Sequence, residues 1–66
     1  MAVAKTIELS SSSSVSFEDA IQQGVARANQ TLNNVEGAWI QDQKVVVKDG
    51  NIVEYRVHMK VTFVLE

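Results

Sequence analysis

The stretch that decides the fold is Ile52-Val-Glu-Tyr-Arg-Val-His-Met-Lys-Val-Thr-Phe-Val-Leu-Glu66, at the C-terminal end of the sequence. Every second residue from Val53 to Leu65 is apolar or aromatic, whereas the residues between them are mostly polar. A period of two is the pattern of a β-strand with one buried side and one solvent-facing side. We therefore predict a strand over residues 51–65, about 45 Å long at the usual rise per residue.

A second strand is predicted over residues 35–48, and the turn at residues 49–50 joins it to the first. Asp49-Gly50 lies between two apolar runs, and Asp-Gly in that setting is a strong signal for a tight hairpin. The two strands are therefore expected to pair in antiparallel fashion along their whole length.

A two-residue turn fixes which residues of this hairpin face each other, and it gathers most apolar residues on one side. The predicted pairs are Lys48–Asn51, Val46–Val53, Ile40–Met59 and Ala38–Val61 on the core side, and Val45–Glu54, Gln43–Arg56, Gln41–His58, Trp39–Lys60 and Gly37–Thr62 on the other. Two charged side chains, Asp42 and Lys44, then fall on the otherwise apolar core side, opposite Val57 and Tyr55. A bulge of one residue would exchange the two sides.

The N-terminal half reads as a strand over residues 3–9, a serine-rich connector over residues 10–15 and a helix over residues 16–33. Ser16 suits the N-cap of the helix, and Asp19 lies at the position of its reciprocal partner in a capping box. The five consecutive serines before the helix favour a connector, because serine hydroxyls compete for nearby backbone hydrogen bonds. An anion site at the start of the helix is the alternative for this segment.

The order strand–helix–strand–strand predicts an α+β fold, β-α-β-β, with a three-stranded antiparallel-type sheet and one helix packed on one face. The helical crossover is expected to place strand 3–9 parallel to a neighbour, most simply strand 51–65. A helix of this length spans about 27 Å and cannot cover the long hairpin. We therefore expect neighbouring subunits to bury the remaining apolar surface.

The composition also indicates that the protein is an oligomer. The chain has 66 residues, no cysteine and one histidine, so neither disulfides nor a structural zinc ion can reinforce so small a core. Oligomerisation is the means of stabilisation that remains. A net charge of −2 favours neither nucleic acid nor an anionic membrane as a partner, and without an apolar leader a cytoplasmic protein is expected.

No catalytic constellation or metal-ligand pattern is evident, so we expect a protein that is not an enzyme. A cation shared by subunits on a symmetry axis stays open as an alternative. Trp39, the single tryptophan, falls on the polar side opposite Lys60. It suits either an interface with a cation–π contact or a platform for a flat ligand, with Arg56 nearby as a planar cation.

Several segments of the sequence match one known family in order and spacing. They are Lys5-Thr-Ile-Glu-Leu9, Ser16-Phe-Glu-Asp-Ala-Ile21, Ala26-Arg-Ala28 with Thr31 and Asn34, and Tyr55, Val57, Val61, Phe63 and Leu65-Glu66. Over nearly its whole length, the sequence resembles the dodecin family. The resemblance implies a β-α-β-β protomer, a hollow homododecamer, and flavins (riboflavin or FMN) held between subunits for storage.

The resemblance also implies a site, from which this sequence departs. The tryptophan that stacks on the flavin in the family falls on Gly37, and a glutamine of the site falls on Arg56. Asp42 falls where the family has an acidic residue near the ribityl chain. Trp39 lies two residues beyond Gly37 on the same face, about 6.6 Å along the strand. Two hypotheses follow. The first is a flavin-storage shell with its site at Gly37, Trp39, Asp42 and Arg56, and the second is a dodecin-like shell that serves as an assembly or holds another small ligand or ion.

Overall fold

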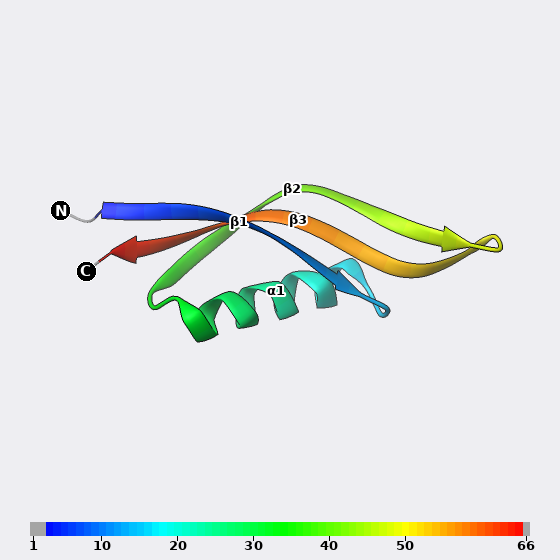
Figure 1. Ribbon diagram of the computed structural model, residues 1–66, viewed down its shortest axis with the longest axis horizontal. Coiled ribbons are helices and arrows are strands. Elements are labelled where there is room, and N and C mark those ends of the chain that lie inside the picture. Colours follow the sequence, from blue (N-terminus) through cyan, green and yellow to red (C-terminus); the bar gives the residue numbers. More distant parts are fainter. Residues whose placement is uncertain (1–2, 66) are drawn as a thin grey trace.

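The computed structural model describes residues 3–65, which form β1 (Val3–Ser13), α1 (Phe17–Thr31), β2 (Val35–Lys48) and β3 (Asn51–Leu65). The strands form one sheet in the order β1-β3-β2, and both pairings are antiparallel. The helix α1 lies on one face of the sheet, and the hairpin of β2 and β3 extends well past it (Figure 1). The predicted α+β class and the antiparallel β-α-β-β arrangement are confirmed.

The expected parallel pairing of the first strand with the last is wrong. The helix connects β1 to β2, and these two strands do run parallel, but β3 lies between them and is antiparallel to both. The hairpin turn sends β3 back along β2, and β3 then offers its free edge to β1. The crossover therefore skips one strand and no parallel ladder forms.

The serine run is a strand as far as Ser13, which corrects the predicted connector over residues 10–15. Each of these serines faces a residue of β3, from Ser10 opposite His58 to Ser13 opposite Tyr55. The long edge of β3 offers hydrogen-bonding partners to the backbone, and this pairing outweighs the weak strand preference of serine. The first strand is therefore four residues longer than the predicted strand 3–9.

The helix begins after Ser16, whose hydroxyl accepts a hydrogen bond from the Asp19 backbone N–H at 3.0 Å. The Asp19 carboxylate does not complete a capping box. It accepts instead from the Ser13 hydroxyl at 2.6 Å and from the Gln23 side-chain amide at 2.5 Å. The end of β1 is thus tied to the first turn of α1. The helix ends at Thr31, two residues before the predicted end, and Asn34 in a left-handed conformation leads into β2.

The core lies between α1 and the sheet. Its fully or nearly fully buried members are Ala20, Ala28, Val57, Met59 and Val61. Gly24 lets the helix approach the sheet closely, because a Cβ atom there would lie 2.9 Å from Met59 Cε and 3.1 Å from Ser11 Cβ. This contact explains a glycine in the middle of a helix. The helix α1 is neither long nor apolar enough to cross a membrane.

The pairing of β2 with β3 contains bulges or irregularities between Val35 and Gly37, Ile40 and Asp42, and Val46 and Val47. The predicted pairs from Gly37 to Ile40 and the pair Lys48–Asn51 are confirmed, whereas those of residues 41–46 are wrong by one position. Asp42 lies opposite His58 and Lys44 opposite Arg56. The shift removes both charges from the core side and gives Gln43 the position opposite Val57.

The far part of the hairpin is uncovered within the single chain. Its exposed apolar side chains are Val45, Val47, Ile52 and Val53. The chain measures 51 Å along its longest axis, so the 15-residue helix covers only part of the sheet. This surface is of the kind that a neighbouring subunit buries.

Candidate functional site on the open face of the sheet

The face of the sheet that points away from α1 carries the polar side chains of β3, and we call it the open face. The alternation of a strand sends Val57, Met59 and Val61 toward the helix, so Arg56, His58 and Lys60 point the other way. The period-two pattern of β3 therefore supplies apolar side chains to the core on one face and polar side chains to the open face on the other.

Cross-strand neighbours arrange the open face in three rows, each named here after its residue on β3. The Arg56 row is Ser12–Arg56–Lys44, the His58 row is Ser10–His58–Asp42, and the Lys60 row is Glu8–Lys60–Trp39. Directly opposite side chains in an antiparallel sheet have Cβ atoms about 4.5–5.5 Å apart. The members of a row are thus close enough to act on one ligand.

In the Lys60 row, the Trp39 side chain is 65% exposed. The ammonium group of Lys60 lies 5.6 Å from the centroid of its ring. The predicted pairing of these two residues is confirmed, and it forms a cation–π contact. Gly37 lies opposite Thr62 on the same face, and a Cβ atom at Gly37 would meet nothing within 4 Å. The ring of Trp39 therefore borders an open stretch of sheet.

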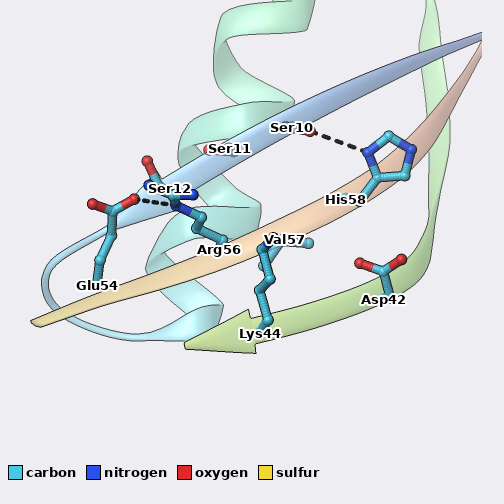
Figure 2. A pocket seen from close by; sticks show the side chains of 9 residues that line it. All are labelled: Ser10, Ser11, Ser12, Asp42, Lys44, Glu54, Arg56, Val57 and His58. Carbon is cyan, nitrogen blue, oxygen red and sulfur yellow. Dashed lines mark hydrogen bonds and ion pairs between the residues drawn. The ribbon is translucent and has the colours of Figure 1, made fainter. Parts of the chain in front are cut away.

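In the His58 row, the imidazole contacts two side chains of β1. His58 Nδ1 lies 3.1 Å from the Ser10 hydroxyl, and His58 Nε2 lies 3.0 Å from Glu8 Oε1 (Figure 2 shows the first contact). The hydrogen bond from His58 lowers the pKa of Glu8 below its ordinary range, and desolvation acts in the opposite direction. Asp42 approaches from β2 on the other side.

The contacts of His58 join a hydroxyl, an imidazole and a carboxylate, an arrangement that the sequence pattern does not predict. The side chains of His58 and Glu8 are 36% and 58% exposed. Catalysis by such a set needs a buried acid that orients the imidazole and a site that excludes water. This row is open to solvent, and we assign it no catalytic role.

In the Arg56 row, two cations face each other. Arg56 Nε lies 2.6 Å from Glu54 Oε1, a neighbour on the same strand (Figure 2). The hydrogen bond from Arg56 lowers the pKa of Glu54 below its ordinary range, with a smaller contribution from the Ser12 hydroxyl. Lys44 lies directly opposite Arg56, and it makes no ion pair with any residue of 3–65.

A pocket of about 570 Å³ spans the Arg56 and His58 rows (Figure 2). Side chains from all three strands line it, among them Ser10, Ser12, Asp42, Lys44, Arg56 and His58. Its size is in the range of small-molecule sites.

Of the four residues predicted for the site, the pocket contains Asp42 and Arg56. Trp39 and Gly37 lie on the same open face, in the Lys60 row and one pair beyond it, outside the pocket lining.

Lys44, Ser10 and Ser12 were absent from the predicted site. The sequence predicts a connector for the two serines, and it predicts the core side for Lys44 because a hairpin register without the bulge after Ile40 puts Lys44 there. A signal was nevertheless present in the sequence, since two charges at core positions indicate that the register is wrong there.

No cluster of three or more histidine, cysteine or acidic residues within residues 3–65 could hold a metal ion. The open face instead offers an exposed aromatic ring, hydroxyl groups, the three acids Glu8, Asp42 and Glu54, and several cations. This combination suits a flat ligand that also carries polar groups.

Solved structures with the same fold are similar to the chain along its whole length. A T. thermophilus dodecin carrying an arginine-to-alanine mutation is 32% identical, with 100% of this chain and 98% of that chain covered and a TM-score of 0.94. The dodecin of Streptomyces davaonensis is 29% identical, with 98% and 96% of the two chains covered and a TM-score of 0.93.

A calcium-chelating antigen from Mycobacterium tuberculosis, described as a calcium dodecin, is 26% identical, with coverages of 97% and 91% and a TM-score of 0.84. No curated protein matches the chain significantly. Residues 3–66 match the family described as Dodecin, and this match extends over almost the entire sequence. The chain belongs to the dodecin family.

Proposed function

We propose that this dodecin binds a flavin on the open face of its sheet and stores it within a homododecameric shell. The family consists of non-enzymatic proteins that bind small ligands and form homo-oligomers. The proposal adds the identity of the ligand, the number of subunits and the residues that hold the flavin.

The observation that carries the proposal is the exposure of Trp39 beside a polar pocket. Indole offers a large flat surface, and aromatic rings prefer offset stacking on such a surface. Lys60 lies over the ring of Trp39 at 5.6 Å, so a stacked isoalloxazine either takes the opposite side of the ring or displaces the flexible lysine. Either arrangement leaves the flavin next to the His58 row.

The space at Gly37 supports the same placement. The resemblance puts the stacking tryptophan of the family at this position, and here the side chain is missing. Because a Cβ atom at Gly37 would meet nothing within 4 Å, the sheet surface beside Trp39 is unobstructed in the single chain. A flavin that stacks on Trp39 can extend over Gly37 and Thr62, which are paired across the strands.

Polar groups for the rest of the ligand lie on the pocket side of Trp39. Asp42 can accept hydrogen bonds from ribityl hydroxyls, and Ser10 can both donate and accept. Arg56 donates to carbonyl or phosphate oxygens. All three line the pocket, although they come from three different strands.

A second candidate function is a shell that holds an ion or another ligand, and the calcium dodecin of M. tuberculosis is the observation that favours it. Calcium takes six to eight oxygen ligands. Residues 3–65 of one chain bring no three acidic or histidine side chains together, so such a site would need carboxylates from several subunits.

The test is a riboflavin titration of the purified protein in which flavin and tryptophan fluorescence are followed together. We expect both signals to be quenched and to saturate, since Trp39 is the only tryptophan in the sequence. Trp39→Phe should retain part of the affinity, and Trp39→Ala should lose about tenfold or more, the worth of one aromatic stacking contact. Unchanged affinity in Trp39→Ala would refute the site.

A calcium titration of the same preparation addresses the second candidate. If calcium raises the melting temperature and riboflavin does not, the result supports an ion-binding shell and contradicts a flavin-binding one.

A further inference from the structure

We propose that Thr6 and Thr62 determine which flat ligand the open face accepts, because their hydroxyls donate hydrogen bonds to N5 and to the C4 carbonyl oxygen of an oxidised isoalloxazine ring. This inference rests on the proposed flavin function and adds two residues that do not line the pocket. The ligand class that they favour is a planar heterocycle with two hydrogen-bond acceptors on the edge away from its polar arm.

The two threonines belong to a fourth row of the open face, which we call the Thr62 row. Thr6 lies opposite Thr62 on β1, and Gly37 lies opposite Thr62 on β2. This row is next to the Lys60 row, about 6.6 Å farther along β3, on the side of Trp39 away from the pocket. The hydroxyls therefore lie beside the surface over which a flavin stacked on Trp39 extends.

The arm of the flavin decides which edge of the ring faces the Thr62 row. The ribityl arm is attached at N10, and N5 and the C4 carbonyl lie on the opposite long edge of the ring system. The groups that suit the arm, Ser10 and Asp42, lie in the His58 row on the pocket side of Trp39. An arm that points to the His58 row therefore turns N5 and the C4 carbonyl toward the Thr62 row.

The hydroxyls of the two threonines are available as donors. Thr6 Oγ1 and Thr62 Oγ1 lie 3.5 Å apart, a long distance for a hydrogen bond between hydroxyls, so their mutual contact is weak. Each hydroxyl carries one O–H donor that rotates to suit its acceptor. In oxidised flavin, N5 and the C4 oxygen are both acceptors and are neighbours on the ring edge. Two adjacent donors thus meet two adjacent acceptors.

Gly37 gives the ring access to these hydroxyls. A Cβ atom at this position would meet nothing within 4 Å, so the ring can lie close to the strands beside Thr62. A ring without acceptors on that edge would cover the hydroxyls and leave them unpaired, which is unfavourable for a polar group removed from water. The threonine pair therefore discriminates against hydrocarbon-like rings of the same shape.

The experiment compares riboflavin with 5-deazariboflavin, which has the same shape but carries a C–H group in place of N5. Quenching of Trp39 fluorescence reports the binding of either ligand to the intact oligomer. In the double variant Thr6→Val, Thr62→Val, we expect the preference for riboflavin over 5-deazariboflavin to fall by about two- to tenfold, the worth of a neutral hydrogen bond. Thr31→Val is the matched control, because it removes a threonine hydroxyl on α1, and it should leave the preference unchanged.

A second double variant, Thr6→Ser, Thr62→Ser, separates ligand recognition from a purely structural role. It retains both hydroxyls and should keep the wild-type preference, whereas a structural role would change the affinity for both ligands alike. A preference that survives in the valine double variant, or that is lost in the serine double variant as well, would overturn the hydroxyl contacts and leave flavin storage intact. If neither ligand quenches Trp39, the proposed function itself fails together with this inference.

Discussion

Replacement of Gly24 by alanine tests the close packing of α1 on the sheet. Alanine is the better helix former by about 1 kcal/mol, so the substitution would stabilise the protein if helix propensity alone decided the outcome. The added methyl group, however, would lie 2.9 Å from Met59 Cε, 3.1 Å from Ser11 Cβ and 3.3 Å from Leu9 Cδ1. Cε is the flexible end of the Met59 side chain, but Met59 is fully buried, so any shift of this atom has to be accommodated by closely packed core neighbours.

Overpacking of this kind costs about 1–3 kcal/mol. Set against the gain in propensity of about 1 kcal/mol, the expected result is a net loss of about 1 kcal/mol in the free energy of unfolding. The assay is urea-induced unfolding followed by circular dichroism. Wild type and variant must be compared at the same protomer concentration, because the stability of an oligomer depends on it.

A control within the same helix calibrates the propensity. Ala26 is exposed on α1, and Ala26→Gly should cost about 1 kcal/mol from propensity alone. If Gly24→Ala instead raised the free energy of unfolding by the amount that Ala26→Gly lowers it, the helix would not lie as close to Met59 and Ser11 as described.

Three further changes test the core, the ligand platform and the ion pairs. Met59→Ala should lower the free energy of unfolding by about 2–5 kcal/mol, since it leaves a cavity under a fully buried residue, and thermal melts will measure the loss. Gly37→Trp should lower riboflavin affinity in a fluorescence titration, because its indole would fill the open sheet surface over which a flavin stacked on Trp39 extends; unchanged or higher affinity would count against the proposed ring position. Glu8 and Glu54 have pKa values lowered from 4.5 in the folded protein, so their stabilising effect is present above that pH and is lost below it as they become protonated. The double variant Glu8→Gln, Glu54→Gln should therefore show melting temperatures that fall less steeply with acidification, and a profile parallel to that of the wild type would show that these hydrogen bonds contribute nothing.

The sequence was sufficient for the elements whose signals are local. The alternation around Met59 and the Asp49-Gly50 turn predicted the hairpin, and the spacing of apolar residues after Ser16 predicted the helix. The pairs next to Trp39 were also predicted, because the turn sets the register and the two shifts between them compensate.

The rest depends on contacts between segments far apart in the sequence. The bulge after Ile40 is set by how β2 lies along β3, and its only sequence signal was the presence of Asp42 and Lys44 at core positions. The strand at Ser10–Ser13 exists because β3 is long enough to pair with it, which serine propensity does not reveal. For the same reason, the sequence predicted the face of Trp39 correctly but not the pocket formed next to it.

The most direct test of flavin binding on the open face is a crystal structure of the protein grown with FMN. We expect density for the isoalloxazine ring against Trp39, and density for the ribityl arm on the pocket side of Trp39, toward Asp42 and Arg56. An absent flavin, or a flavin bound without contact to Trp39, would contradict it.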